Sequence, residues 1–170
     1  MGFLSVLLFV RLLGVEQYGH YAVIFTFVIA CASGLGGWLS QGILRFQSQW
    51  HQPEQARNFF RAILSGIVYS VITGLVLLAI ALPLFGIETG WSLLIPLCLL
   101  GILTAYIVAA AHFQASFRSM KVLRLEAVRS ILCLVVPAAL LLIASLRSYR
   151  LLLLGVAIGH ALPLVWQFFL

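Results

Sequence analysis

Residues 62–85 read AILSGIVYSVITGLVLLAIALPLF, an apolar run that no charged residue interrupts. A helix that crosses the hydrocarbon core of a bilayer needs about 20 such residues. The run is too long for a strand, and its apolar residues do not alternate with polar ones. The stretch therefore predicts a membrane-spanning helix.

The rest of the chain has the same character. Its 170 residues are 64% hydrophobic and only 8% charged, whereas a soluble domain has roughly 25% charged residues. A small fold keeps a large surface, so much of this apolar surface must face lipid. We expect an all-α, polytopic membrane helix bundle that forms a single domain over residues 1–170. The net charge of +6 does not predict nucleic-acid binding, because the basic residues lie in a few short loops.

Six apolar segments are expected to form the transmembrane helices. They are residues 2–13, 21–39, 62–85, 91–111, 131–146 and 151–170. The first segment is too short to cross alone, and it lacks the positive start and cleavage site of a signal peptide. We therefore expect it to be a span that has lost its beginning. The final FFL has no polar cap, which favours a chain that is part of a longer protein.

The loops predict the orientation. Seven basic residues lie on one side of the predicted bundle and three on the other. The richer side has Arg45, Arg57, Arg61, Arg118, Lys121, Arg124 and Arg129, and the poorer side has Arg11, Arg147 and Arg150. Basic loops stay preferentially in the cytoplasm. We therefore expect a multi-pass protein of the cell inner membrane with a cytoplasmic N-terminus.

The stretch LLGVEQYGHYA at residues 12–22 is a small polar segment between two apolar runs. We expect it to form an outer hairpin turn. Gly14 would end the first helix in a left-handed cap, and Gly19 would ease the turn. Tyr18 and Tyr21 would anchor both sides at the membrane interface, where amphipathic rings are favoured.

Small residues recur every fourth position in several spans. The sets are Gly66/Ser70/Gly74, Gly101/Ala105/Ala109, Gly155/Gly159, and in the second span Ala30/Gly34, Ala32/Gly36 and Ser33/Gly37. Such positions let helix backbones approach closely in lipid. Glycine and alanine are also common in membranes for other reasons, so a single stripe is weak evidence. The four together favour a packed bundle.

Residues 116–130 connect the fourth and fifth spans. Met120, Leu123, Ala127 and Ile131 share one helical face, which predicts an interfacial helix that leads into the fifth span. The basic residues of this segment are expected to contact anionic lipid headgroups. They are Arg118, Lys121, Arg124 and Arg129. Binding of a lipid carrier's diphosphate is the alternative.

Residues for chemistry are sparse. No catalytic set, metal cluster or phosphate loop is present in the sequence, so we expect neither an enzyme nor a cofactor or metal site. Cys31, Cys98 and Cys133 lie inside apolar runs and are interpreted as small buried hydrophobes. All four glutamates, Glu16, Glu54, Glu88 and Glu126, are expected in loops or at helix ends. The predicted spans therefore contain no carboxylate for ion coupling.

Three ionisable residues lie in or near the predicted spans. His160 is central in the sixth span, where it is either a functional group or a neutral histidine bonded to a neighbouring helix. Arg11 and Arg45 lie near span ends, where each side chain either snorkels to the interface or points into a cavity to meet an anion. Pro96, Pro137 and Pro163 would kink their helices, as hinges or as static packing features.

Two motifs suggest a family. RLLGVEQYGHYA at residues 11–22, followed by an apolar helix and GLGGWLSQGILRF at residues 34–46, resembles the start of the polysaccharide biosynthesis and export proteins. These are oligosaccharide flippases of the multidrug/oligosaccharidyl-lipid/polysaccharide (MOP) exporter superfamily. The resemblance is good over about residues 3–46 and weaker over 113–145. His20 departs from it, because a small or apolar residue is expected there.

The resemblance implies the amino-terminal lobe of a transporter. Such a lobe would translocate polyprenyl-diphosphate-linked oligosaccharide units through a cationic cavity shared with a second lobe. Arg11 and Arg45, and less strongly His160, would then contact the substrate or lipid headgroups. A drug or metabolite exporter of the same superfamily would prefer an intramembrane acid. A non-transporting scaffold or truncated remnant is the other alternative.

Overall fold

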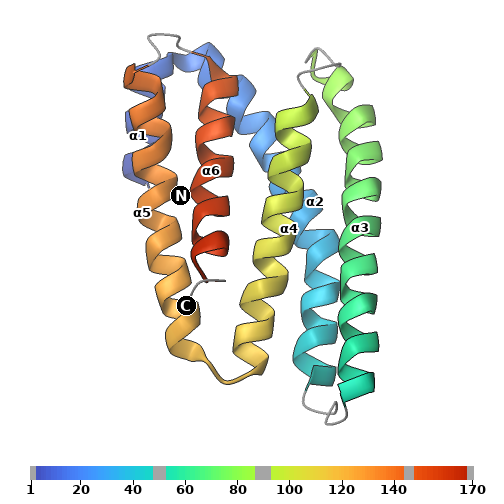
Figure 1. Cartoon of the computed structure of the whole chain (residues 1–170). Helices are drawn as coiled ribbons and strands as arrows, with labels where there is room; N and C mark the ends of the chain where they lie inside the picture. The colour runs from blue at the N-terminus through green and yellow to red at the C-terminus, as the bar shows by residue number, and fades with distance from the viewer. Residues whose placement is uncertain (1–2, 48–52, 87–92, 144–147, 168–170) are drawn as a thin grey trace.

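The computed structural model describes residues 3–47, 53–86, 93–143 and 148–167. These residues form six helices and no strand (Figure 1). The helices are α1 (Phe3–Leu13), α2 (Val15–Phe46), α3 (Pro53–Leu84), α4 (Leu94–Ala115), α5 (Ser119–Ile143) and α6 (Tyr149–Gln167). Five of them, α2 to α6, are long and apolar enough to cross a membrane. The prediction of an all-α membrane helix bundle is confirmed.

Several helices begin earlier than the apolar runs predict. Helix α2 begins at residue 15 rather than 21, α3 at 53 rather than 62, and α5 at 119 rather than 131. Hydropathy marks only the part of a helix that lies in lipid. The backbone hydrogen-bond ladder continues through the polar residues beside it, because each added residue gains another bond.

The predicted outer turn over residues 12–22 is wrong in extent. A single residue, Gly14, separates α1 from α2, and Glu16, Tyr18 and Gly19 already belong to α2. Gly14 has φ 84° and ψ 163°. The positive φ agrees with the prediction of a glycine-specific conformation, but the ψ angle is not that of a left-handed helical cap.

The predicted interfacial helix over residues 116–130 is also wrong. Its residues from Ser119 onward form the first half of α5, which continues without a break into the membrane-spanning half. The turn before it contains Phe117 at φ 56°, a left-handed conformation. The Arg118 amide donates to the Phe113 carbonyl at 2.9 Å across this turn, which is the pattern of a Schellman cap.

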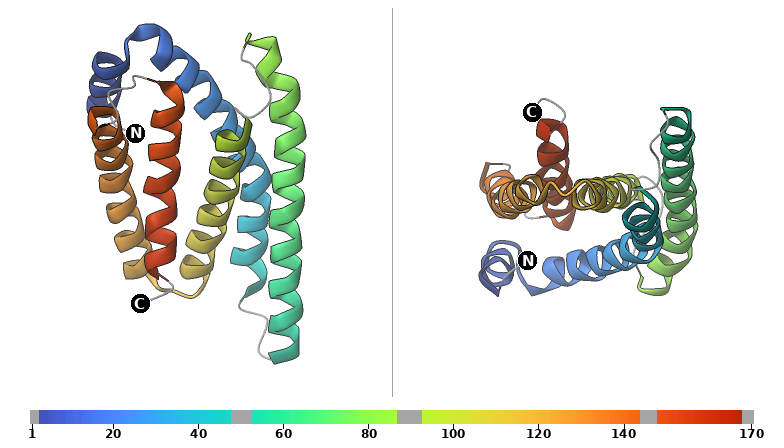
Figure 2. Two further views of the ribbon diagram at one scale, coloured as in Figure 1. Left: turned by 45° about the horizontal axis from the view of Figure 1, so that its top comes forward. Right: turned by 90° about the horizontal axis from the view of Figure 1, so that it is seen from below.

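The helices form two groups that share α4. Helix α2 packs chiefly against α4, and α5 packs chiefly against α6. Figure 2 shows α1 and α2 along one side, α4, α5 and α6 along the other, and α3 across one edge. The largest core cluster lies where these groups meet, and its fully buried members include Tyr21, Val28, Leu99 and Leu152.

The small-residue positions are confirmed as helix contacts in several places. A Cβ built on Gly155 would lie 2.6 Å from the Pro137 Cα, and one on Gly159 would lie 3.0 Å from the Cys133 Cα. Helices α5 and α6 therefore approach backbone to backbone, as the GxxxG pair predicts. Gly34 and Gly37, in contrast, have no neighbour within 4 Å of such a Cβ.

The bundle has two ends with different charge. Helices α2 and α4 end, and α3 and α5 begin, at the lower end in Figure 1, which we call the basic end. Its described basic residues are Arg45, Arg57, Arg61, Arg118, Lys121 and Arg124. The opposite end carries Arg11 and Arg150.

The three prolines predicted inside spans lie within α4, α5 and α6. Pro96 is in the first turn of α4, where the missing amide is tolerated.

Candidate functional site

A salt bridge lies inside α5. The Arg129 side chain donates from Nη2 at 2.6 Å and from Nε at 3.1 Å to Glu126 Oε2. The pair has i,i+3 spacing, which places both residues on the same helical face. Glu126 lies about 10 Å along α5 from its first residue, in a helix of about 37 Å, whereas the hydrocarbon core is about 30 Å thick. The pair is therefore within reach of the membrane interior.

Helix α4 contributes a tyrosine to this pair. The buried Tyr106 hydroxyl donates to Glu126 Oε1 at 2.7 Å. The Arg129 guanidinium also lies 5.3 Å from the centre of the Tyr106 ring, which adds a cation–π contact. Tyr106 of α4 thus contacts both members of the α5 salt bridge, through a hydrogen bond to Glu126 and a cation–π contact with Arg129.

Helix α6 contributes His160, whose side chain is only 4% exposed. Its Nδ1 lies 2.8 Å from the Val156 carbonyl oxygen one turn earlier, and its Nε2 lies 3.4 Å from Arg129 Nη1. This arrangement fits a neutral ring that donates from Nδ1 and accepts at Nε2. The Cys133 sulfur lies 3.2 Å from Nδ1. Histidine, arginine and carboxylate therefore form one network across three helices.

The close approach of α5 and α6 makes this network possible. Gly159 packs directly on the Cys133 backbone, and His160 is the next residue. A larger side chain at position 159 would separate the helices and move the imidazole away from Arg129. We call Tyr106, Glu126, Arg129, Cys133 and His160 the polar network. The Gly155/Gly159 pair brings α5 and α6 close enough for this network to form.

The structure corrects two interpretations from the sequence. Glu126 is not in a loop or at a helix end, because it is the eighth residue of α5 and lies inside a candidate span. Arg129 was expected to contact lipid headgroups. Its side chain is instead 29% exposed and bound to Glu126. Arg118 and Arg124 are exposed at the basic end, and Lys121 lies over the Phe113 ring, so these three remain candidates for headgroup contact.

The three predicted substrate-binding residues do not lie together. Arg11 is exposed in the last turn of α1, and Arg45 is exposed in the last turn of α2. The 32 residues of α2 separate them along an axis of about 48 Å. Of the three, only His160 belongs to the polar network. Arg11 and Arg45 therefore cannot contact the same small group in this arrangement.

Tyr106, Glu126 and Cys133 were missed as members of a site. The i,i+3 spacing of Glu126 and Arg129 was visible in the sequence. The same spacing is also compatible with the surface helix that the apolar face of residues 116–130 predicts. Tyr106 gave no comparable indication, since an isolated tyrosine in a span is common near interfaces.

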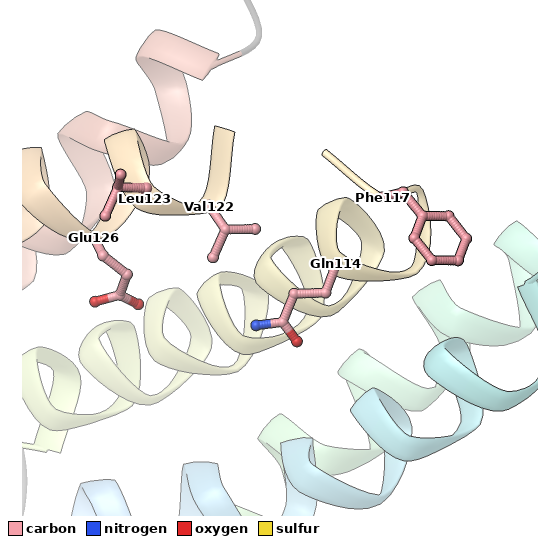
Figure 3. Close-up of a pocket in the computed structure, with 5 residues that line it drawn as sticks. All are labelled: Gln114, Phe117, Val122, Leu123 and Glu126. Carbon is pink, nitrogen blue, oxygen red and sulfur yellow. The ribbon is translucent and has the colours of Figure 1, made fainter. Parts of the chain in front are cut away.

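An open groove lies beside the network at the basic end. It has a volume of about 480 Å³ and is lined by Gln114, Phe117, Val122, Leu123 and Glu126 (Figure 3). Figure 3 shows Val122, Leu123 and Glu126 coming from α5, and Gln114 and Phe117 from α4 and the turn after it. The lining is mostly apolar. Glu126 therefore belongs both to the network and to the wall of the groove.

Among the described residues, no three His, Cys, Asp or Glu side chains lie close enough to hold a metal ion. Cys133 is buried, Cys31 is half-buried and Cys98 is exposed, so the interpretation as buried hydrophobes holds for Cys133 and is wrong for Cys98.

A scan against protein-family models and searches of curated proteins and of solved structures found no match to this chain. Membership of the MOP superfamily therefore stays a prediction.

Proposed function

We propose that the chain is the amino-terminal lobe of a transporter that moves lipid-linked oligosaccharide units across the cytoplasmic membrane. The observation that carries the proposal is the polar network inside an otherwise apolar bundle. Ionisable residues within membrane-spanning helices are costly, and they usually serve a substrate or ion pathway. The resemblance of residues 11–46 to oligosaccharide flippases supplies the substrate class.

Deletion of the reading frame tests this function. Lipid-linked oligosaccharide should then accumulate in the cytoplasmic leaflet, and re-expression of the unmodified reading frame should restore its export. Arg129→Met should fail to restore export, because it removes the cation that joins the carboxylate to His160. Arg57→Met is the matched control, since Arg57 is exposed on α3 outside the network. Full export by inserted Arg129→Met would contradict the proposal, and normal glycan export after deletion would favour a scaffold.

The orientation is part of the proposal. With a cytoplasmic N-terminus, the basic end faces the cytoplasm. Glu16 and Gln55 are exposed near opposite ends of the bundle. A membrane-impermeant maleimide added to intact cells should label Glu16→Cys and spare Gln55→Cys. The unsubstituted chain controls for its three native cysteines, and the reverse pattern of labelling would overturn the orientation.

The roles of Arg11 and Arg45 remain separate predictions. Arg11 and Arg45 lie near opposite ends of α2, which favours independent contacts, one at each membrane surface. Arg11→Ala and Arg45→Ala should each lower export while the protein still inserts. A variant that inserts normally and exports fully removes that residue from the substrate-contacting set.

One observation favours a second candidate, a drug or metabolite exporter of the same superfamily. Such an exporter would prefer an intramembrane acid, and Glu126 lies inside a candidate span. Transport by the purified product of the whole reading frame, reconstituted in proteoliposomes, separates the two candidates. Uptake of an amphiphilic cation that Glu126→Gln abolishes, without transport of a lipid-linked glycan, would support the exporter.

A further inference from the structure

One face of α3 at the basic end carries two arginines followed by apolar side chains. Arg57 and Arg61 are one helical turn apart, and Leu64 and Val68 continue the same face at spacings of three and four residues. All four are exposed, Leu64 at 54% and Val68 at 51%. The opposite face of α3 is turned toward α2 and α4, where Phe59 packs against their buried residues. The four exposed side chains therefore lie on the outer face of the bundle.

The order of these residues along α3 matches the layers of a bilayer. Helix α3 is 32 residues long, or about 48 Å, whereas the hydrocarbon core is about 30 Å thick. The apolar run begins at residue 62, so both arginines precede it at the basic end, where α3 begins (Figure 1). Leu64 and Val68 lie about 5 and 10 Å deeper than Arg61. The positive charge is therefore at the level of the headgroups, and the apolar side chains are at the level of the acyl chains.

The two guanidinium groups of this face are available to a ligand. Helical residues with i,i+4 spacing have Cβ atoms about 5–6 Å apart, so Arg57 and Arg61 can bind the same phosphate group. Among the residues that the structure describes, neither side chain takes part in an ion pair or a hydrogen bond. Arg129, in contrast, is held by Glu126. Two unpaired arginines on one face favour an anionic ligand.

Charge also separates the lipids that could lie here. Glu54 is the acid closest in sequence, and it lies three residues before Arg57, farther from the apolar run. An ammonium group at the level of the arginines would be repelled by both of them. A phospholipid whose headgroup has no ammonium group is therefore the better complement to this face.

We propose that this face of α3 binds an anionic phospholipid, with its phosphate on Arg57 and Arg61 and an acyl chain along Leu64 and Val68. The phosphate and the acyl chain then follow the same order across the membrane as the residues that bind them. The bound lipid would cover the outer side of α3, which lies across one edge of the bundle (Figure 2). This binding does not depend on the transport activity proposed above.

Titration of the purified product of the whole reading frame with lipids in detergent tests this proposal, with bound lipids counted by native mass spectrometry. Phosphatidylglycerol should bind about tenfold more tightly than phosphatidylcholine or phosphatidylethanolamine with the same acyl chains, because each exposed arginine contributes about threefold. Glycerol phosphate, which lacks acyl chains, should not displace phosphatidylglycerol at equal concentration. Equal binding of the three lipids, tighter binding of a neutral lipid, or full displacement by glycerol phosphate would each overturn the proposal.

Variants locate the site. Arg57→Met and Arg61→Met should each lower the affinity for phosphatidylglycerol about threefold, and the double variant should bind all three lipids equally. Arg150→Met is the matched control, because it removes an exposed arginine at the opposite end, and it should keep the preference. An unchanged preference in the double variant would overturn the proposal. An equal loss in Arg150→Met would also overturn it, because net charge would then explain the binding. Arg57→Met should still export lipid-linked oligosaccharide, so loss of this site is distinguishable from loss of transport.

Discussion

Helix α4 is packed in two different ways on its two sides. Toward α2 the contact along the helices is mostly apolar and includes a small residue, since a Cβ built on Gly36 would lie 3.6 Å from Thr104 Cγ2. Toward α5 and α6 the contact is polar, because Tyr106 binds Glu126 and lies beside Arg129. Lipid gives no hydrophobic drive for helix association. The α2 side of α4 therefore depends chiefly on shape, with one hydrogen bond from Gln47 to Ser116 where the two helices end, and the other side depends on charge and hydrogen bonds within the bundle as well.

The largest effect is expected where two backbones touch. Gly155→Ala places a methyl group 2.6 Å from the Pro137 Cα, and a backbone cannot move aside without separating α5 from α6. The free energy of unfolding in detergent should fall by about 3 kcal/mol. Gly66→Ala is the control, because its added methyl group meets only the flexible end of Leu39. Equal losses for both variants would show that the α5–α6 contact is not tight.

The second largest loss of stability is expected when the Glu126–Arg129 salt bridge is removed. Arg129→Met leaves Glu126 with one partner and removes the neighbour of His160 Nε2. The free energy of unfolding should fall by about 2 kcal/mol, less than for a fully buried pair because both side chains are partly exposed. In a double-mutant cycle, Arg129→Met with Glu126→Gln should lose less than the sum of the single losses. Additive losses would mean that the pair adds no stability.

Two smaller changes in stability compare the side of α4 that faces α5 and α6 with the side that faces α2. Tyr106→Phe removes a donor to a carboxylate, so the free energy of unfolding should fall by about 1 kcal/mol. Thr104 is buried, and among the described residues its hydroxyl has no hydrogen-bond partner. Thr104→Val should therefore raise the free energy of unfolding by up to about 1 kcal/mol. A loss for Thr104→Val would reveal a partner for that hydroxyl.

The smallest effect is expected at the turn after α4. Phe117 has φ 56° and is 93% exposed, so its side chain contributes little packing while its backbone is strained. Phe117→Gly should raise the free energy of unfolding by about 0.5 kcal/mol, because glycine adopts this conformation without a steric penalty but gains more backbone freedom in the unfolded chain. Phe117→Leu keeps the strain and should give no gain. Equal stability of the two variants would argue against strain at this turn.

The sequence predicted the parts of this fold that depend on local composition. Six apolar runs predict spanning helices, and five of the six observed helices are long and apolar enough to cross a membrane. The Gly155/Gly159 pair predicts a tight helix contact, which is confirmed. Helix ends were less well predicted, because a hydropathy boundary marks the edge of the lipid and not the end of the hydrogen-bond ladder. The start of α5 was misplaced for this reason, and Glu126 was misplaced with it.

By itself, the sequence determined that this chain is a polytopic helical protein whose basic residues gather at one end, since both properties follow from the residue types along each segment. Only the tertiary structure decided which polar residues meet. Tyr106 and His160 are far from Glu126 in sequence, and their contacts arise because α4, α5 and α6 pack together at one register. The residue types of a helix limit which groups it can contact, and the packing of the helices decides which groups it does contact.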